Sequence, residues 1–477
     1  MTRLQMMSNE EHTTRIETDM IEDFKAQFQG QLIRPEDDSY DEARSIWNAM
    51  IDKYPALIAQ CQGTADVINA VRFARDNNLL LAIRGGGHNV AGNAVCDNGL
   101  VIDLSQMKGI HVNPSERTVR VQPGVTWGEL DHESQMFGLA TPGGIVSETG
   151  IAGLTLGGGF GWLSRKYGFS SDNLRSVDVV TAQGDLITAS DSENPDLFWG
   201  IRGGGGNFGI VTSFEYNLHP VGPDVLAGVI IYRLEDAKDV LHFYRDFTAD
   251  APQELGSMAV FRTAPPAPFI PDALHGKPVL AIVVCYTGDL DKGKKIIQPL
   301  KDFGNPIADA IKLKTYAEQN AMLDAGQPEG LQYYWKSEYL HDISDDAIET
   351  LISYGAEITS PNTRVALFQL GGAIQNTDEM AMAVSHRDAE YVLAINTGWQ
   401  NPTDNKREIQ WTQDFWMAMQ PFSSGGVYVN FLSQDDGQNR VRAAYGDEKY
   451  DKLVQLKDKF DSENLFRMNQ NIQPETT

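Results

Sequence analysis

A triple glycine followed by a histidine constrains this chain more than any other segment. The apolar run 79–83 predicts a strand, and Gly85, Gly86, Gly87 and His88 follow it after a single arginine. Because glycine has no Cβ, its backbone N–H groups can approach a ligand closely, and successive N–H groups in such a turn form a concave anion site. The segment therefore predicts either a tight turn with a surface histidine or a phosphate-binding loop with His88 beside the ligand.

Two further glycine-rich segments favour the second interpretation. Residues 143–168 hold nine glycines, where average usage of about 7% predicts roughly two. The apolar residues between these glycines indicate a buried loop against a flat ligand rather than a flexible linker. Residues 203–206 are four consecutive glycines, followed by Asn207, Phe208 and Gly209. No Gly-Lys-Ser/Thr follows, as a Walker A loop requires, and no strand directly precedes residues 143–168, as a dinucleotide fingerprint requires.

Composition excludes several classes of partner. The 477 residues include 65 acidic and 39 basic side chains, a net charge of -26, which argues against nucleic acid and anionic membranes as partners. The three cysteines show neither metal-ligand spacing nor a disulfide framework, so no metal site is predicted. The polar N-terminus does not resemble a secretory signal, and no apolar run is long enough to span a bilayer. We expect a soluble, cytoplasmic protein.

Composition and hydrophobic periodicity differ between parts of the chain. Residues 1–18 are polar and charged, and disorder is predicted there. Pro220 and Pro223 flank a natural boundary, after which glycine clusters disappear and strands alternate with helices. That middle part is the better candidate for substrate binding. Its predicted strands are residues 225–232, 258–262, 279–286, 364–371 and 391–398, and its helices lie near 235–247, 290–303, 344–355 and 405–419. A strand at 426–431 and a helix at 447–459 are predicted in the tail.

Six segments together resemble the FAD-linked oxidases of the vanillyl-alcohol-oxidase superfamily, in its berberine-bridge-enzyme-like branch. They stand in that family's order and spacing, and the resemblance extends from about residue 65 to residue 472. The segments are RGGGH at 84–88, GLTLGGGFG at 153–161, RKYG at 165–168, GGGNFG at 204–209, HR at 386–387 and NLFR at 464–467.

The resemblance implies an α+β fold with a two-part FAD-binding domain of the PCMH type. Residues 19–222 would form its N-terminal part and residues 425–477 would complete it. Residues 223–424 would form a substrate-binding domain, an antiparallel sheet covered by helices. The implied cofactor is FAD, and the residues that match its binding segments are Arg84, Gly85, Gly86, Gly87, His88, Asn89, Thr149, Gly150, Gly153, Leu154, Gly157, Gly158, Gly161, Asn207, Gly209, Val211, Asn469 and Asn471.

His88 matches the family's histidine that bonds covalently to the flavin 8α-methyl carbon. A neutral imidazole suits this chemistry, since its unperturbed pKa is about 6.5. Many relatives add a second link through a cysteine, but Val146 occupies the matching position, so we expect a single covalent link. Cys96 does not match that second site and is expected to be a packed thiol.

The catalytic base is harder to place. Plant relatives carry a glutamate shortly after a Gly-Gly pair, but no carboxylate follows Gly371-Gly372 within residues 373–377. Tyr428 matches a tyrosine that other relatives use, and His386 lies in a stretch that borders the active site in relatives. For both, packing or a structural hydrogen bond is the alternative. A phenolate base would need its pKa lowered, and Arg387 or His386 is a candidate for that role.

The implied reaction is hydride transfer from a CH–OH or CH–NH carbon to flavin N5, after which O2 reoxidises the flavin and yields hydrogen peroxide. A dehydrogenase with a quinone or protein acceptor and a flavin-carrying binding protein are the alternatives. The substrate would be a small molecule such as a sugar, an alcohol or a secondary metabolite. Aromatic candidates for contacting it are Tyr333, Tyr334, Trp335 and Trp399. The sequence leaves the oligomeric state open.

Overall fold

The computed structural model describes residues 3–10 and 12–475, and two sheets build its N-terminal half. One has the order β3-β4-β6-β5, with three parallel strands and one antiparallel edge strand. The other is antiparallel, with the order β11-β10-β12-β8-β7. Their bounds are β3 Gln31–Ile33, β4 Leu57–Gln60, β5 Leu81–Arg84, β6 Leu100–Asp103, β7 Ile110–Asn113, β8 Thr118–Val121, β10 Leu174–Val180, β11 Leu186–Ser190 and β12 Ile210–Asn217. The strand predicted before the triple glycine is β5.

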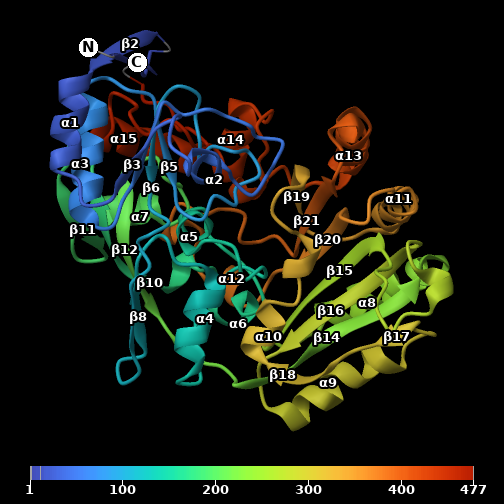
Figure 1. The fold of residues 1–477 in the computed structure, drawn as a ribbon. Helices are drawn as coiled ribbons and strands as arrows, with labels where there is room; N and C mark the ends of the chain where they lie inside the picture. The colour runs from blue at the N-terminus through green and yellow to red at the C-terminus, as the bar shows by residue number, and fades with distance from the viewer. Residues whose placement is uncertain (1–2, 11, 476–477) are drawn as a thin grey trace.

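Residues 224–399 supply an eight-stranded antiparallel sheet, as predicted for the middle of the chain (Figure 1). Its order is β17-β14-β16-β15-β20-β21-β19, and β18 also pairs with β14. The strands are β14 Asp224–Arg233, β15 Leu255–Thr263, β16 Pro278–Tyr286, β17 Ala308–Asp309, β18 Lys312–Thr315, β19 Gln332–Leu340, β20 Arg364–Gln369 and β21 Tyr391–Trp399.

The two faces of this sheet pack against different parts of the molecule. Phe261 and Leu367 belong to a core shared with four helices, whereas their neighbours Val260 and Ala366 belong to the core of the glycine loops. Successive residues of a strand point to opposite faces, so one sheet face carries helices and the other faces the N-terminal half. The helices are α8 Ala237–Ala249, α9 Leu290–Asp302, α11 Asp345–Gly355 and α13 Asn405–Met419.

Further helices connect the remaining segments. A capping box begins the helix that starts at Trp127, since the side chains of Thr126 and Glu129 each bond the other's backbone N–H. These helices are α1 Thr18–Ala26, α2 Tyr40–Arg44, α3 Thr64–Asp76, α4 Trp127–Gln135, α5 Ile151–Leu156, α6 Ser164–Tyr167, α7 Pro195–Ile201, α10 Tyr316–Asn320 and α12 Ala373–Asn376. Among the residues described, no helix is both long and apolar enough to cross a membrane.

The C-terminal segment returns to the N-terminal half (Figure 1). Helix α14 (Gln438–Tyr445) leads into α15 (Asp447–Phe460), which packs against α7. The Asn207 amide donates to the carbonyl of Gln470 (3.2 Å) and accepts from the N–H of Ile472 (2.9 Å). These contacts fit a tail that completes the FAD domain, although the domain boundaries themselves stay predictions.

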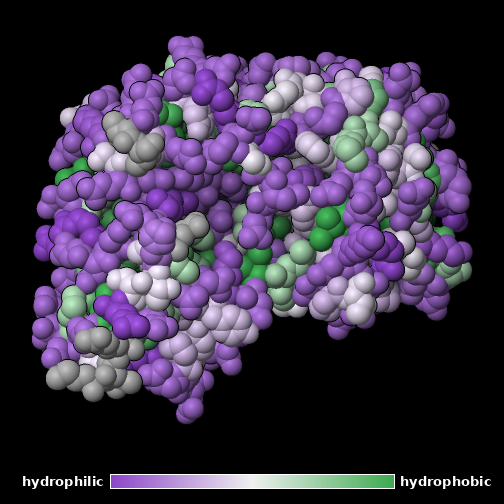
Figure 2. Space-filling model, turned by 90° about the horizontal axis from the view of Figure 1, so that it is seen from above, coloured by the Kyte–Doolittle hydropathy of each residue, from purple (hydrophilic) through white to green (hydrophobic). Residues whose placement is uncertain are grey.

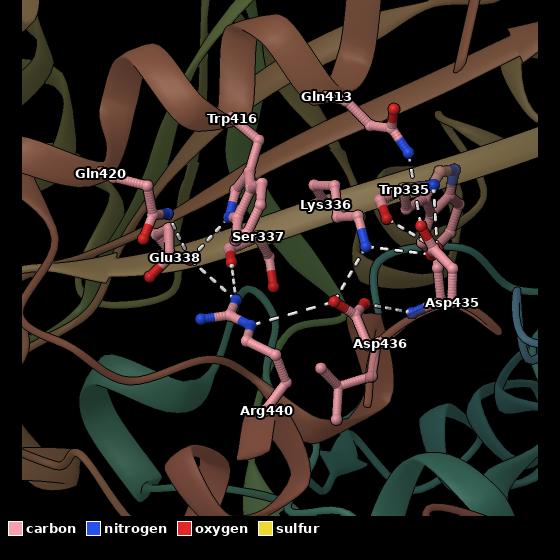
Figure 3. A network of polar contacts seen from close by, with 12 residues as sticks. Trp335, Lys336, Ser337, Glu338, Gln413, Trp416, Gln420, Asp435, Asp436 and Arg440 are labelled. Atoms are coloured by element: carbon pink, nitrogen blue, oxygen red, sulfur yellow. Dashed lines mark hydrogen bonds and ion pairs between the residues drawn. The ribbon is translucent and has the colours of Figure 1, made fainter. Parts of the chain in front are cut away.

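A polar network holds the segment before α14 onto the sheet (Figure 3). The Glu338 carboxylate, fully buried on β19, accepts from the indole N–H of Trp416 (2.6 Å) and pairs with Arg440 (2.7 Å). Lys336, two residues earlier, pairs with Asp436 (2.8 Å). Buried charges are tolerated only when they are paired in this way. Glu338 also accepts from the hydroxyl of Ser423 (2.5 Å), so the middle of β19 anchors the chain on both sides of Tyr428.

Two predictions of local structure need correction, and one strand was missed. The described part of residues 1–18 is a hairpin, β1 (Arg3–Met7) with β2 (Thr13–Glu17), because Met6 and Ile16 bury against the N-terminal core. Residues 426–431 are not a strand, and a 3₁₀ turn at Val429–Phe431 occupies their end. Strand β19 was not predicted, since its run QYYWKSEYL is buried throughout and lacks a clean alternation.

Candidate active site

A cavity of about 820 Å³ lies between the glycine loops and the inner face of the large sheet. Its volume is in the range of small-molecule and cofactor sites. The face of the molecule in Figure 2 is largely hydrophilic, and hydrophobic residues reach the surface in a depression near its centre. Fifteen of the predicted site residues line the cavity: Gly85, Gly86, Gly87, His88, Asn89, Thr149, Gly150, Gly153, Leu154, Gly157, Asn207, Gly209, Val211, Tyr428 and Asn469.

The first two glycine loops cross with their backbones in contact. A Cβ on Gly86 would lie 2.7 Å from the Cα of Gly150, closer than Cβ atoms come to other heavy atoms in proteins. By contrast, a Cβ on Gly153 or Gly206 would meet no atom within 4 Å, and both residues line the cavity. Glycine therefore serves two purposes: it lets the loops cross, and it leaves a cradle that side chains would otherwise fill.

His88 follows the first loop with one ring nitrogen unsatisfied. Its Nε2 is buried and has no hydrogen-bond partner among the described residues. Its imidazole stacks on the indole of Trp47, with ring centroids 4.3 Å apart and planes at 17°. Burial lowers the pKa of His88 to about 4, so the ring is neutral at pH 7. A buried polar atom without a partner is rare in proteins and here fits an attachment point for a bound group.

Tyr428 lies on the cavity wall beneath the second loop. Its hydroxyl accepts hydrogen bonds from the N–H of Gly159 (3.0 Å) and the side-chain amide of Asn430 (2.8 Å), while its ring packs on Phe160. Burial raises the pKa of Tyr428 to about 12. Both protein partners are donors, so the hydroxyl proton remains available to a ligand.

Five predicted site residues lie outside the cavity wall. Four of them, Arg84, Gly158, Gly161 and Asn471, belong to the loops or tail behind it. His386 is the clear departure, because its Nε2 bonds the carbonyl of Ala443 (2.8 Å) and its ring stacks on Tyr339. These contacts fit the packing role that was the alternative for His386, and its catalytic role stays a prediction.

The predicted cation beside Tyr428 is also absent from the described contacts. Arg387 is buried and pairs with Asp172 (2.6 Å), and none of its hydrogen bonds reaches Tyr428. The Gly371-Gly372 turn does not line the cavity. The one carboxylate among the described lining residues is Asp309, which Lys301 neutralises (2.5 Å). No carboxylate is therefore free to act as a base in the described wall.

Cys96 is the packed thiol that was predicted, whereas the single covalent link predicted from Val146 stays a prediction. Val146 lines the cavity and is 7% exposed. Cys96 is a buried free thiol that does not line the cavity, and burial raises its pKa to about 12. Neither position offers a reactive thiolate.

Comparison with known proteins decides the family. The FAD binding domain family matches residues 55–190, and the family described as berberine and berberine like matches residues 427–473. An FAD-linked oxidoreductase of Dictyostelium discoideum is 32% identical over 96% of this chain and 97% of its own length. The chain is a berberine-bridge-enzyme-like FAD-linked oxidoreductase.

This oxidoreductase is also 32% identical to (R)-6-hydroxynicotine oxidase of Paenarthrobacter nicotinovorans, over 94% of this chain and 97% of that protein. The crystal structure of 6-hydroxy-D-nicotine oxidase from Arthrobacter nicotinovorans matches with a TM-score of 0.85 at 29% identity, covering 94% and 98% of the two chains. The predicted superfamily, the α+β fold with its PCMH-type FAD domain and the FAD cofactor are thereby confirmed.

Two site residues escaped the sequence analysis. Trp47 lies in a segment with no motif, and only the fold places it on His88. Arg364 begins a predicted strand, and its 6% exposure could not be read from its position. An arginine at the edge of an otherwise apolar run, RVALFQ, was the one available signal.

Proposed function

We propose that this FAD-linked oxidoreductase is an oxidase whose FAD is attached to His88 by a single covalent link. The supporting observation is the unpartnered Nε2 of His88, which sits among glycine loops that line the cavity. Its lowered pKa keeps the imidazole a neutral nucleophile at pH 7. Trp47 stacks on the imidazole of His88 and holds the plane of that ring.

FAD held here would accept a hydride from a CH–OH or CH–NH carbon at N5 and pass the electrons to O2, giving hydrogen peroxide. The chain supplies the surroundings for that transfer. The inner sheet face, with Val260 and Ala366, covers the cavity and limits water. We infer that the hydroxyl of Tyr428, on the cavity wall, exchanges a proton with the substrate hydroxyl or amine. A positioned proton acceptor typically contributes a factor of about 10²–10⁴.

The experiment is anaerobic reduction of the purified holoprotein with a panel of alcohols, sugars and amines, followed by admission of oxygen. In an oxidase, one compound of the panel bleaches the flavin, and oxygen then yields one molecule of hydrogen peroxide for each flavin reoxidised. Bleaching without oxygen uptake identifies a dehydrogenase, which overturns the proposal. A flavin that no compound reduces identifies a binding protein. Acid precipitation of the same sample reports the covalent link, because attached flavin stays in the yellow pellet.

A further inference from the structure

Cationic side chains gather on the cavity wall of a strongly acidic protein. The chain carries a net charge of -26, yet the wall contains one carboxylate, Asp309, already paired with Lys301. Four cations line the described wall, all from the sheet that covers the cavity: Arg262, Lys312, Lys314 and Arg364. The local charge therefore opposes the charge of the whole molecule.

Arg364 is the cation with the most incomplete surroundings. It is 6% exposed, and its Nε and Nη1 are buried without a hydrogen-bond partner. No ion pair or hydrogen bond to its guanidinium exists among the described residues. The guanidinium lies against Gly326, whose missing side chain makes room for it. A guanidinium has five donors, and burying them unpaired is costly.

The charge state of Arg364 reflects that environment. Burial, with a further contribution from the neighbouring charge of Arg262, lowers the pKa of Arg364 to about 9. Two cations in one low-dielectric wall repel each other, and an anion between or beside them would relieve both the repulsion and the desolvation.

Strand register extends this cation pair toward the flavin attachment site. Phe261 of β15 pairs with Val365 of β20, so the adjoining residues Arg262 and Arg364 lie side by side. Arg364 also pairs with Asn396, and Asn396 pairs with Trp335. Directly opposite residues of an antiparallel pair share one face. A single row thus runs across four strands on the cavity face.

One end of this row reaches the proposed flavin attachment site. Trp335 contacts Trp47 edge to face, with centroids 5.4 Å apart, and Trp47 stacks on His88. The Asn396 Oδ1, between Trp335 and Arg364, is another buried acceptor without a partner among the described residues. A ligand lying along the row would present a donor to Asn396 and an anionic group to Arg364.

We propose that Arg364, with Arg262 beside it, binds an anionic group of the substrate, a carboxylate or a phosphate. The substrate class is then an anionic alcohol or amine with a hydrogen-bond donor between its anionic group and its reacting carbon. That the bound anion is a substrate rests on the proposed oxidase function. The anion site itself stands on the geometry of β15, β20 and β21.

Calorimetric titration of the flavin-loaded chain with benzoate, phenyl phosphate and benzamide tests the site. The two anions separate a carboxylate site from a phosphate site, and benzamide is the neutral match of benzoate. At least one anion should bind about tenfold or more tightly than benzamide, because hydrogen bonds to charged groups are the strong ones. Equal binding of all three compounds, or binding of none, overturns the proposal.

Variants tie the preference to Arg364. In Arg364→Met the favoured anion should bind no better than benzamide, whose affinity stays unchanged, and Arg364→Lys should fall between. Arg175→Met is the matched control, because Arg175 is exposed on β10 and makes only a 3.7 Å ion pair with Glu215. An anion preference that survives in Arg364→Met overturns the proposal. So does loss of flavin from a folded Arg364→Met, which would assign the arginine to the cofactor.

Binding is measured without turnover, so its outcome is independent of the oxidase proposal. A flavin that no compound reduces, in a protein that still prefers benzoate, contradicts the function and leaves the anion site intact. A reducible flavin in a protein that shows no anion preference supports the function and contradicts the anion site. If Arg364→Met does not fold, the wild-type comparison of benzoate with benzamide still decides.

Discussion

The indole of Trp47 lies between two rings from opposite halves of the molecule. Its centroid is 4.3 Å from that of His88 on one side and 3.7 Å from that of Tyr333 on the other, with planes at 17° and 12°. Tyr333 belongs to β19 of the large sheet, whereas His88 follows the first glycine loop. The proposed flavin attachment point is thus braced, through one tryptophan, by the sheet that covers the cavity.

Replacing Trp47 tests whether this brace matters for flavin attachment. In Trp47→Leu the His88 ring loses its stacking partner and can rotate, so covalent attachment should be slower and incomplete. The fraction of flavin retained in the acid pellet measures it, and we expect a fall to below about half, since stacking contributes roughly 1 kcal/mol. Trp411→Leu, on α13 behind the sheet, is the control. Full attachment in Trp47→Leu would show that the loop alone orients His88.

His88 itself gives the sharpest test of the link. His88→Ala should release all flavin on acid precipitation, while the glycine loops still bind FAD without a covalent bond. Peptide mass analysis of the wild type should find flavin on the peptide containing His88 and on no cysteine, because Val146 occupies the second attachment position. Val146→Cys asks whether a second bond forms when a thiol is supplied. Flavin on Cys96 in the wild type would contradict the single link.

The sequence predicted those parts of the site that local chemistry dictates. Gly86 and His88 stand in motifs whose meaning depends on neighbours along the chain, and both line the cavity. The place of Trp47 depends on Tyr333, far along the chain, and that of Arg364 on Gly326 and the neighbouring strand β21, so short sequence patterns say little about either residue. His386 shows how little a family resemblance says about one side chain: its stretch borders the active site in relatives, whereas its ring here packs on Tyr339, and its catalytic role stays a prediction.

The same distinction holds for the fold. Helices α11 and α13 were predicted within a few residues, because their hydrophobic periodicity is strong. Strand β19 was missed because both its faces are buried, one within the network of Lys336 and Glu338. The hairpin at the N-terminus was missed because its few apolar residues, Met6 and Ile16, bury against a core that forms elsewhere.

Acid stability should depend on His219. Burial first, and the charges of Lys166 and Arg117 next, lower its pKa from 6.5 to about 4. The unfolded chain therefore binds a proton at this residue that the folded chain does not, so stability falls as pH decreases from about 6.5 to about 4.

His219→Gln removes this titration and keeps a donor for Asn173, which His219 contacts at 2.6 Å. Between pH 6.5 and pH 4 the variant should lose up to about 2 kcal/mol less than the wild type, a value reduced for partial solvent screening. Urea unfolding at several pH values measures the difference. Above pH 7 the two curves should run parallel, and parallel curves down to pH 4 would contradict the assignment.

Tyr428 is the last and most specific prediction. Burial raises its pKa to about 12, while the donors Gly159 and Asn430 favour its ionised form. If the phenolate accepts the substrate proton, only a small ionised fraction is active at pH 7. The rate of anaerobic flavin reduction should then rise with pH over the whole range in which the protein stays folded.

Tyr428→Phe should abolish that rise and slow flavin reduction by about a hundredfold, in line with the usual contribution of a positioned base. Flavin content and reoxidation by oxygen should stay unchanged, since phenylalanine keeps the packing against Phe160. Tyr445→Phe is the matched control, because Tyr445 also lines the cavity but donates to the carbonyl of Gly203. Stopped-flow spectra of both variants across pH decide the matter. A Tyr428→Phe variant that reduces its flavin at the wild-type rate would leave Tyr428 a packing residue.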